Sequence, residues 1–240
     1  MNGGAGMLFR QFFEPESSTY TYLLASGRGR EALIIDPVKE QAEQYLQAIR
    51  ELDLRLVRAI DTHTHADHIT ALGDLREATG CITIMGERSR AECVSQTVRD
   101  GEMLEVDGVT LQALYTPGHT DESFSFVLAP ARPRAVFTGD VLLIRGSGRT
   151  DFQGGDPEQS WQSIVDRLFR LPDETLLYPA HDYRGWTVSS IGEEKAHNPR
   201  LAGRTREQYV SLMRELKLPD PKKMDVAVSA NLACGRPRLA

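Results

Sequence analysis

The chain has 240 residues, 40% hydrophobic and 26% charged, a composition typical of a globular protein that buries a substantial core. Its formal net charge of −6 argues against a nucleic-acid surface, because phosphate binding usually needs a concentrated basic face. Cys81, Cys93 and Cys234 are widely spaced and form no CxxC pair, which excludes a disulfide-rich scaffold and favours a reducing compartment.

The first third of the chain is predicted to form a β-meander followed by a helix. Apolar runs bounded by turn residues predict strands over 7–13, 20–25 and 32–35. Apolar residues then recur at helical spacing over 38–52, so the helix should begin near Pro37.

The next strand should end in an unusually polar segment. The strand is expected over 56–60, and the segment THTHADH follows it at 62–68. A helix that carries Ile69, Leu72 and Leu75 should come next. The polar cluster therefore lies at the carboxyl end of a strand.

The middle of the chain should continue the sheets. Strands are expected over 103–106, 109–115, 123–128 and 135–138. The segment TPGHT at 116–120 should form a loop between two of them. After a glycine-rich loop over 145–155, Asp156 should cap a helix that has Pro157 at its first position and continues through Leu168.

The last part of the chain should add one short strand and one capped helix. The strand is expected over 176–178 and leads into PAHD at 179–182. Thr205 and Gln208 form a capping-box pattern at the start of a helix through Leu216. Strands interleaved with helices in both halves favour two packed sheets with helices outside.

We expect one compact domain over residues 1–240, with the C-terminal helical segment of about 188–240 as part of it. No stretch approaches the length of a membrane-spanning helix, and residues 1–7 lack the basic and apolar regions of a signal peptide. The prediction is a cytoplasmic protein that binds neither membranes nor nucleic acid.

The polar segment 62–68 has the composition of a metal site. It places His63, His65, Asp67 and His68 just past a strand, where the backbone can turn several of them toward one point. Imidazole and carboxylate groups suit zinc, iron or manganese, whereas core packing would hardly use such polar groups. A solvated loop, or a helix cap at Asp67, is the structural alternative.

His119, Asp140 and His181 are further candidate ligands. Each of them alone could be an ordinary turn or hydrogen-bonded residue. Each also follows a predicted strand directly, so their loops could open on the same edge of a layered fold as segment 62–68. This common placement favours one shared metal site.

The ordered series THTHADH, TPGHT, TGD and PAHD resembles the metallo-β-lactamase superfamily from about residue 21 to the end of the chain. The resemblance implies an α/β fold of the αββα sandwich type, in which two mixed β-sheets pack face to face with helices outside. It also implies a metal site at one edge. Within the superfamily, the segments 138–153, 178–185 and 198–200 resemble the persulfide dioxygenase group.

Members of that group bind one Fe(II) through two histidines and one aspartate, which correspond to His63, His119 and Asp140. Such a facial triad leaves other coordination positions open for substrate and O₂. The resemblance implies oxidation of glutathione persulfide with O₂ and water to sulfite and glutathione. With one iron bound, the remaining polar residues should orient the ligands through hydrogen bonds, namely His65, Asp67, His68 and His181.

The residues themselves leave the number of metal ions open. Seven potential ligands would also suit two metal ions that share a hydroxide, the arrangement of a hydrolase. The alternative is therefore a glyoxalase-II-like hydroxyacylglutathione hydrolase with a dinuclear site. Only the resemblance favours one metal.

Substrate contacts are expected from the loop after Asp140. Arg145 and Arg149 flank its glycine-rich part, and a guanidinium there could hold a carboxylate with two hydrogen bonds; Arg149 is favoured for glutathione. Asp151, Tyr178 and Tyr183 could add hydrogen bonds, although a tyrosine after a strand is more often a packing residue.

The segment NLACG at 231–235 resembles a tail found in this family and could bring Cys234 close to the substrate. The alternative, which applies more strongly to Cys81 and Cys93, is that a cysteine is simply a small buried apolar residue. Members of the family are often dimeric, so the resemblance also implies a homodimer.

Overall fold

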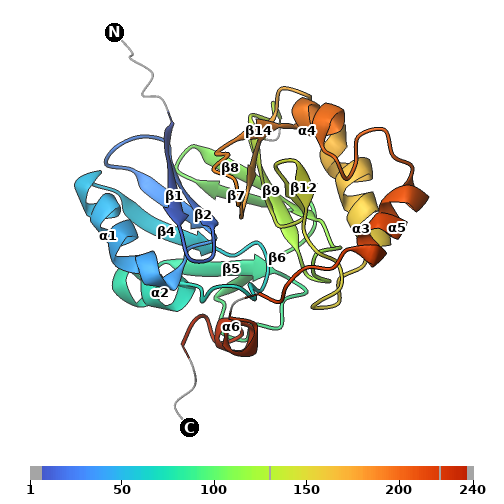
Figure 1. Ribbon diagram of the computed structural model, residues 1–240. Coiled ribbons are helices and arrows are strands. Elements are labelled where there is room, and N and C mark those ends of the chain that lie inside the picture. The colour runs from blue at the N-terminus through green and yellow to red at the C-terminus, as the bar shows by residue number, and fades with distance from the viewer. Residues whose placement is uncertain (1–6, 130, 222, 237–240) are drawn as a thin grey trace.

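A computed structural model describes residues 7–129, 131–221 and 223–236 (Figure 1). The expected domain over 1–240 also contains stretches outside the described residues, namely 1–6, 130, 222 and 237–240. The prediction for the N-terminal stretch 1–7 falls almost wholly there. Among the described helices, none is both long and apolar enough to cross a membrane.

The first sheet is a meander that continues into parallel strands. Its six strands lie side by side in chain order, β1 (Leu8–Glu14), β2 (Thr19–Ala25), β3 (Glu31–Ile35), β4 (Arg55–Ile60), β5 (Ile82–Gly86) and β6 (Gln96–Val98). β1 to β3 pair antiparallel, and β3 to β6 pair parallel. Every residue of β2 is buried, as expected for a central strand covered on both faces.

The second sheet is largely antiparallel. Its order is β14 (Ser189–Ser190), β13 (Leu176–Pro179), β10 (Ala135–Gly139), β9 (Phe124–Leu128), β8 (Val109–Tyr115) and β7 (Met103–Val106). β10 and β13 are the parallel pair in this sheet. A two-stranded ribbon follows β10, formed by β11 (Leu142–Leu143) and β12 (Gly146–Ser147).

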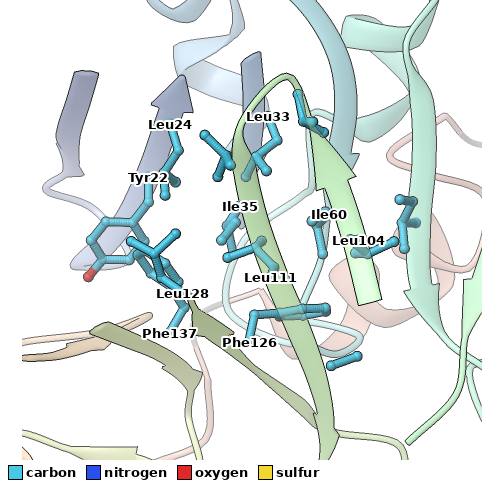
Figure 2. Close-up of a cluster of buried hydrophobic side chains, with 14 of the residues drawn as sticks. Tyr22, Leu24, Leu33, Ile35, Ile60, Leu104, Leu111, Phe126, Leu128 and Phe137 are labelled. Carbon is cyan, nitrogen blue, oxygen red and sulfur yellow. The ribbon is translucent and has the colours of Figure 1, made fainter. Parts of the chain in front are cut away.

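The main core lies between the two sheets. Figure 2 shows side chains of the first sheet, among them Tyr22 and Leu33, that point toward Leu111, Phe126 and Phe137 of the second. All five are almost completely buried. At about 25 cal/mol per Å² of apolar surface, burial of such large side chains is the main force that holds the sheets together.

Helices cover the outer faces of both sheets, which completes the expected αββα sandwich (Figure 1). The helices are α1 (Ala42–Glu51), α2 (Leu72–Thr79), α3 (Pro157–Trp161), α4 (Ile191–His197), α5 (Arg206–Glu215) and α6 (Met224–Asn231). α1 and α2 pack on the first sheet, and α3 and α5 on the second. The predicted fold class is confirmed.

Two helices begin later than predicted. Val38 and Thr70 form an isolated β-bridge, so both stay out of helices. After Val38, a 3₁₀ turn over Lys39–Gln41 precedes α1. α2 begins only at Leu72, and Ile69 precedes it. A contact between two loops therefore overrides the local helical pattern.

The capping predictions hold. The Asp156 side chain accepts hydrogen bonds from two backbone amides at the start of α3, and Thr205 and Gln208 form the capping box of α5. The helix predicted from Pro157 through Leu168 is helical throughout, but it is not α-helical over its whole length. A π-helical stretch over Gln162–Arg167 separates α3 from a final 3₁₀ turn.

The cysteines differ from expectation. Cys93 and Cys234 form a disulfide, which the prediction of a reducing compartment did not include, and Cys81 is free and buried. The two bonded residues are 141 positions apart, so spacing gives no hint of the pair. The predicted reducing compartment therefore loses the support of these two residues.

Candidate metal site and substrate cavity

All seven predicted metal-site residues lie on loops that follow strands. The loops after β4, β8, β10 and β13 carry His63, His65, Asp67, His68, His119, Asp140 and His181. Ligand-type atoms of these residues gather in two clusters at one edge of the sandwich, each within 4.8 Å. His63, His119 and Asp140 form the first cluster, and the other four form the second.

Thr62 and Asp36 orient His63. The backbone N–H of Thr62 donates to Oδ1 of Asp36 at 2.7 Å, and its hydroxyl donates to Oδ2 at 3.1 Å. The same hydroxyl can then accept from Nδ1–H of His63, 3.0 Å away. This tautomer leaves the Nε2 lone pair of His63 available as a ligand.

His119 is oriented by its turn and by a backbone carbonyl. Its Nδ1–H donates to the carbonyl oxygen of Arg149 at 2.9 Å, and its Nε2 lies 3.5 Å from Oδ2 of Asp140. Gly118 has φ of 139°, and a Cβ at this position would lie 2.3 Å from Cα of Ser160. The Pro-Gly turn therefore lets the His119 loop approach α3 closely.

Asp140 follows a second glycine that allows a close approach. A Cβ on Gly139 would lie 2.6 Å from Oγ1 of Thr62. The Asp140 side chain is 13% exposed, and its Oδ1 has no hydrogen-bond partner within the described part of the chain. Burial raises the pKa of Asp140, although His181 and His119 oppose that effect.

The second cluster also contains buried atoms without partners. Nε2 of His65 lies 3.2 Å from Oδ1 of Asp36, and Nδ1 of His68 lies 3.1 Å from Oδ2 of Asp67. Nε2 of His181 is 3.4 Å from Asp67. Among the described residues, three fully buried ring nitrogens lack hydrogen bonds, namely His65 Nδ1, His68 Nε2 and His181 Nε2.

The pKa values of the buried histidines are shifted in opposite directions. Burial and the neighbouring rings hold the pKa of His63 and of His65 well below the usual range, so both are neutral near pH 7. Burial acts the same way on His181, but the carboxylates of Asp140 and Asp67 outweigh it and raise its pKa to about 9.

These features fit a metal site. Within the described ranges, a buried carboxylate oxygen and several ring nitrogens lack partners, and neutral imidazoles are already in the form that binds metal. The donor set of imidazole and carboxylate suits Fe(II), Zn(II) or Mn(II). Either cluster alone has enough donors for one ion.

A cavity of about 430 Å³ opens over the site and exposes His119, Asp140 and His181 to it. This volume lies in the range that holds ligands of small-molecule size. Of the predicted substrate residues, Arg145, Arg149 and Tyr183 line the cavity, and the other three do not, namely Asp151, Tyr178 and Cys234.

The two predicted arginines already have partners. Nε and Nη2 of Arg149 donate to the carboxylate of Asp151 at 2.7 and 2.9 Å, and Nη1 donates to the carbonyl of Pro219. Arg145 pairs with Glu193 and Glu194. A substrate carboxylate could bind Arg149 through the second N–H groups of Nη1 and Nη2, which these bonds leave unused.

The tyrosines and Cys234 have different surroundings. Tyr183 is exposed, and its ring is parallel to that of His181 with centroids 6.0 Å apart. Tyr178 packs against Phe9 and Phe137 beside the main core. Cys234 is buried in the disulfide, so we do not retain it as a substrate contact.

The cavity residues that sequence reasoning missed include two arginines. Arg184 and Arg200 line the cavity. Nη1 of Arg200 donates to the carbonyl of Ser147, and the guanidinium of Arg184 has no hydrogen bond or ion pair with the described residues. Arg184 lies in segment 178–185 and Arg200 in segment 198–200, and both segments carry the family resemblance. That resemblance could have indicated both arginines as site residues.

Comparison with known proteins agrees with this geometry. Residues 15–181 match the profile described as the metallo-beta-lactamase superfamily. Persulfide dioxygenase ETHE1 of Bos taurus is 46% identical over 233 residues, which cover 97% of this chain and 90% of that protein.

A solved structure and a more distant relative complete the comparison. The crystal structure of ETHE1 from Myxococcus xanthus has a TM-score of 0.91 and 52% identity, and covers 95% of this chain and 100% of that one. Hydroxyacylglutathione hydrolase GloC of Haemophilus influenzae is 33% identical over 72% of this chain and 88% of that protein. The chain belongs to the metallo-β-lactamase superfamily and, within it, to the family of the ETHE1 persulfide dioxygenases.

Proposed function

We propose that this protein is a persulfide dioxygenase, which oxidises glutathione persulfide with O₂ and water to sulfite and glutathione. The observation that carries the proposal is the 46% identity with a persulfide dioxygenase over 97% of the chain. Similarity to the hydroxyacylglutathione hydrolase is lower and covers less of the chain.

We propose one Fe(II) per chain, held by His63, His119 and Asp140. Support comes from the position of these side chains, which meet within 4.8 Å, with His119 and Asp140 facing the cavity. Bound Fe(II) supplies the redox chemistry that O₂ needs to react with a closed-shell sulfur, whereas zinc has none.

The second cluster would support the ligands. The cluster adjoins the triad, because the ring centroids of His65 and His63 lie 4.2 Å apart and Nε2 of His181 lies 3.6 Å from Oδ2 of Asp140. Its four residues can orient the ligands and bound water through hydrogen bonds, namely His65, Asp67, His68 and His181. In the metal-free protein, the carboxylates of Asp140 and Asp67, 3.6 and 3.4 Å from Nε2 of His181, raise the pKa of this ring to about 9 and favour its charged form. This charge reduces the repulsion between those two carboxylates.

The cavity would hold the glutathione part of the substrate. We propose that Arg149 binds a substrate carboxylate, with Asp151 as the partner that holds its guanidinium in place beforehand. Arg145 and Tyr183 line the same cavity and would contact the rest of the peptide. Tyr178 would act only through packing behind the site.

The alternative is hydrolysis of an acyl-glutathione thioester at a dinuclear site. The observation that favours it is the complete second cluster, which could hold a second ion beside the first. A hydroxyacylglutathione hydrolase among the relatives agrees with this alternative.

The test measures O₂ consumption by anaerobically purified, Fe(II)-loaded protein after addition of glutathione persulfide, with the metal content of the same sample. We expect one iron per chain, persulfide-dependent O₂ uptake and stoichiometric sulfite. Asp140→Ala should lose iron and activity, whereas Asp173→Ala on the surface should keep both. Two metals per chain, no O₂ uptake and thioester hydrolysis would instead establish the hydrolase.

We also propose that the protein acts as a homodimer in the cytoplasm. The bovine relative is described as mitochondrial, which leaves the location of this chain to experiment. Light scattering on the purified protein should give twice the mass of the 26.7 kDa chain, and cell fractionation should recover it with cytoplasmic markers. A monomeric mass or a membrane-bound fraction would contradict these proposals.

A further inference from the structure

The C-terminal helix contacts the loop that carries four of the site histidines and aspartates. We call residues 62–70 the histidine loop. Asn231, the last residue of α6, is 3% exposed. Its Nδ2 donates to the carbonyls of His65 and His68, both at 2.9 Å, and its Oδ1 accepts from the backbone N–H of Thr70, also at 2.9 Å.

Through these hydrogen bonds, both the amide nitrogen and the amide oxygen of one side chain bind the backbone of one loop. They act at three points within six residues, directly beside the second cluster. Because the groups are buried, loss of one partner would leave a donor or an acceptor unsatisfied. Asn231 is therefore well placed to define the loop conformation.

The residues after α6 continue this contact. The backbone N–H of Gly73 donates to the carbonyl of Cys234 at 3.0 Å, and Nζ of Lys39 donates to the carbonyl of Gly235 at 3.0 Å. A Cβ on Gly235 would lie 2.1 Å from the carbonyl oxygen of Thr70. The tail therefore lies directly against the end of the histidine loop and the start of α2.

A disulfide holds this tail to the body of the protein. Cys234 lies three residues after Asn231 and is bonded to Cys93, which belongs to the segment between β5 and β6. In Figure 1, α6 lies below these strands, at the end of a long connection from α5. The disulfide thus adds a covalent link to the segment that carries Asn231, beside its hydrogen bonds with Lys39, Thr70 and Gly73.

We propose that Asn231 is a positioning residue for the histidine loop, and that the Cys93–Cys234 disulfide is a redox-sensitive tether that keeps Asn231 in place. Reduction of the disulfide would weaken the hydrogen bonds between Asn231 and the loop and speed the loss of bound metal. The inference rests on the metal site of the proposed function and does not depend on its substrate.

The redox step needs a dithiol as reductant. Its first thiolate attacks the sulfur of Cys93, which is only partly buried, whereas Cys234 is 1% exposed. The disulfide bond breaks, and Cys234 leaves as a thiolate that takes up a proton. The second thiol of the reductant then displaces Cys93, which also becomes a thiol, and the reductant ends as a disulfide.

The test measures release of Fe(II) from the loaded full-length protein to an Fe(II)-specific chelator, without substrate. Cys93→Ser removes the tether but keeps Asn231, and Cys81→Ser is the matched control at the free cysteine. We expect Cys93→Ser to release iron roughly ten times faster than wild type, and Cys81→Ser to match wild type. Wild-type protein that is reduced with dithiothreitol, alkylated and desalted before loading should behave like Cys93→Ser.

Asn231→Asp tests the positioning role, because it keeps the shape and the acceptor but loses the two donated hydrogen bonds. We expect release to be about 10- to 100-fold faster, with faster amide hydrogen exchange confined to residues 62–70. Wild-type release rates in Asn231→Asp would overturn the positioning role. Absence of the 93–234 crosslink after air oxidation, or equal rates for wild type and Cys93→Ser, would overturn the tether. A failure of O₂ uptake alone would affect only the proposed function.

Discussion

Asp36 shows how one residue outside the predicted ligand set can control the site. It is buried, has φ of 50°, and accepts hydrogen bonds from Thr62 and His65. Burial raises its pKa to about 6, although the bonds from Thr62 oppose that effect. Through Thr62, it also determines which nitrogen of His63 is free.

Asp36→Ala should therefore weaken metal binding by about 10- to 100-fold. It removes the acceptor that orients His63 and His65 and leaves buried donors unpaired. Metal content after dialysis against a chelator measures the effect. Asp107→Ala is the control, because Asp107 also has a positive φ but pairs with Arg30 at the surface. Equal metal loss in both variants would contradict the proposed role.

His181 should titrate abnormally in the metal-free protein. Its pKa of about 9 exceeds the ordinary 6.5, so the ring stays protonated at neutral pH despite its burial. This group therefore stabilises the metal-free fold fully below pH 6.5, and the contribution is lost as the pH rises through about 9. Nitrogen-15 NMR of the imidazole should show the shift.

Asp140→Asn should lower the pKa of His181, because it removes one of the two carboxylates that favour the imidazolium form. The same NMR titration, on the metal-free variant, measures the change. Asp173→Asn should leave the titration unaltered, since Asp173 pairs with Lys195 on the surface. An unchanged His181 titration in Asp140→Asn would show that another group supports its charge.

At the scale of elements, the site depends on close contacts between loops and helices. The His119 loop lies against the first turns of α3, and only a glycine at position 118 allows this approach. The Asp156 cap holds the start of the same helix, where Asp156 N–H also donates to the carbonyl of Gly118. A ligand loop and a helix start thus form one unit.

Gly118→Ala should displace His119, because the added Cβ would overlap the backbone of Ser160. We expect a loss of metal affinity and a destabilisation of about 1–3 kcal/mol from the backbone conformation alone. Metal titration and thermal unfolding measure both effects. Gly101→Ala is the matched control, since Gly101 has φ of 80° but open space around it. It should lose some stability and keep full metal affinity; wild-type affinity in Gly118→Ala would contradict the argument.

At the scale of the whole molecule, the core between the two sheets also determines how the site is assembled, because each sheet supplies part of it. His63 comes from the first sheet, and His119 and Asp140 come from the second. The distance between them therefore depends on the packing of side chains such as Phe126. We accordingly propose that the chain unfolds as one domain.

Phe126→Ala should lower the free energy of unfolding by about 3–5 kcal/mol in a single cooperative transition. Phe126 is completely buried between the sheets, whereas Phe13 is 43% exposed and Phe13→Ala should cost far less. Chemical denaturation followed by both circular dichroism and fluorescence measures the transition. Two separate transitions, with only one shifted by Phe126→Ala, would show that the chain contains two domains.

The sequence by itself determined the features that depend on local patterns. Apolar runs bounded by turn residues predicted most strands, and the caps at Asp156 and Thr205 could be predicted because capping is decided within a few residues. His63, His119 and Asp140 could be recognised as candidate ligands because each lies in a loop that follows a strand. The ordered motifs then identified the superfamily.

Only the tertiary structure decided the contacts between distant segments. It paired Cys93 with Cys234, joined Arg149 to Asp151, and brought Asn231 onto the histidine loop. It also delayed the starts of α1 and α2 through a bridge between two loops. The physical reason is that such contacts depend on which surfaces the packed sheets bring together. Residue type and spacing along the chain do not predict which surfaces these are.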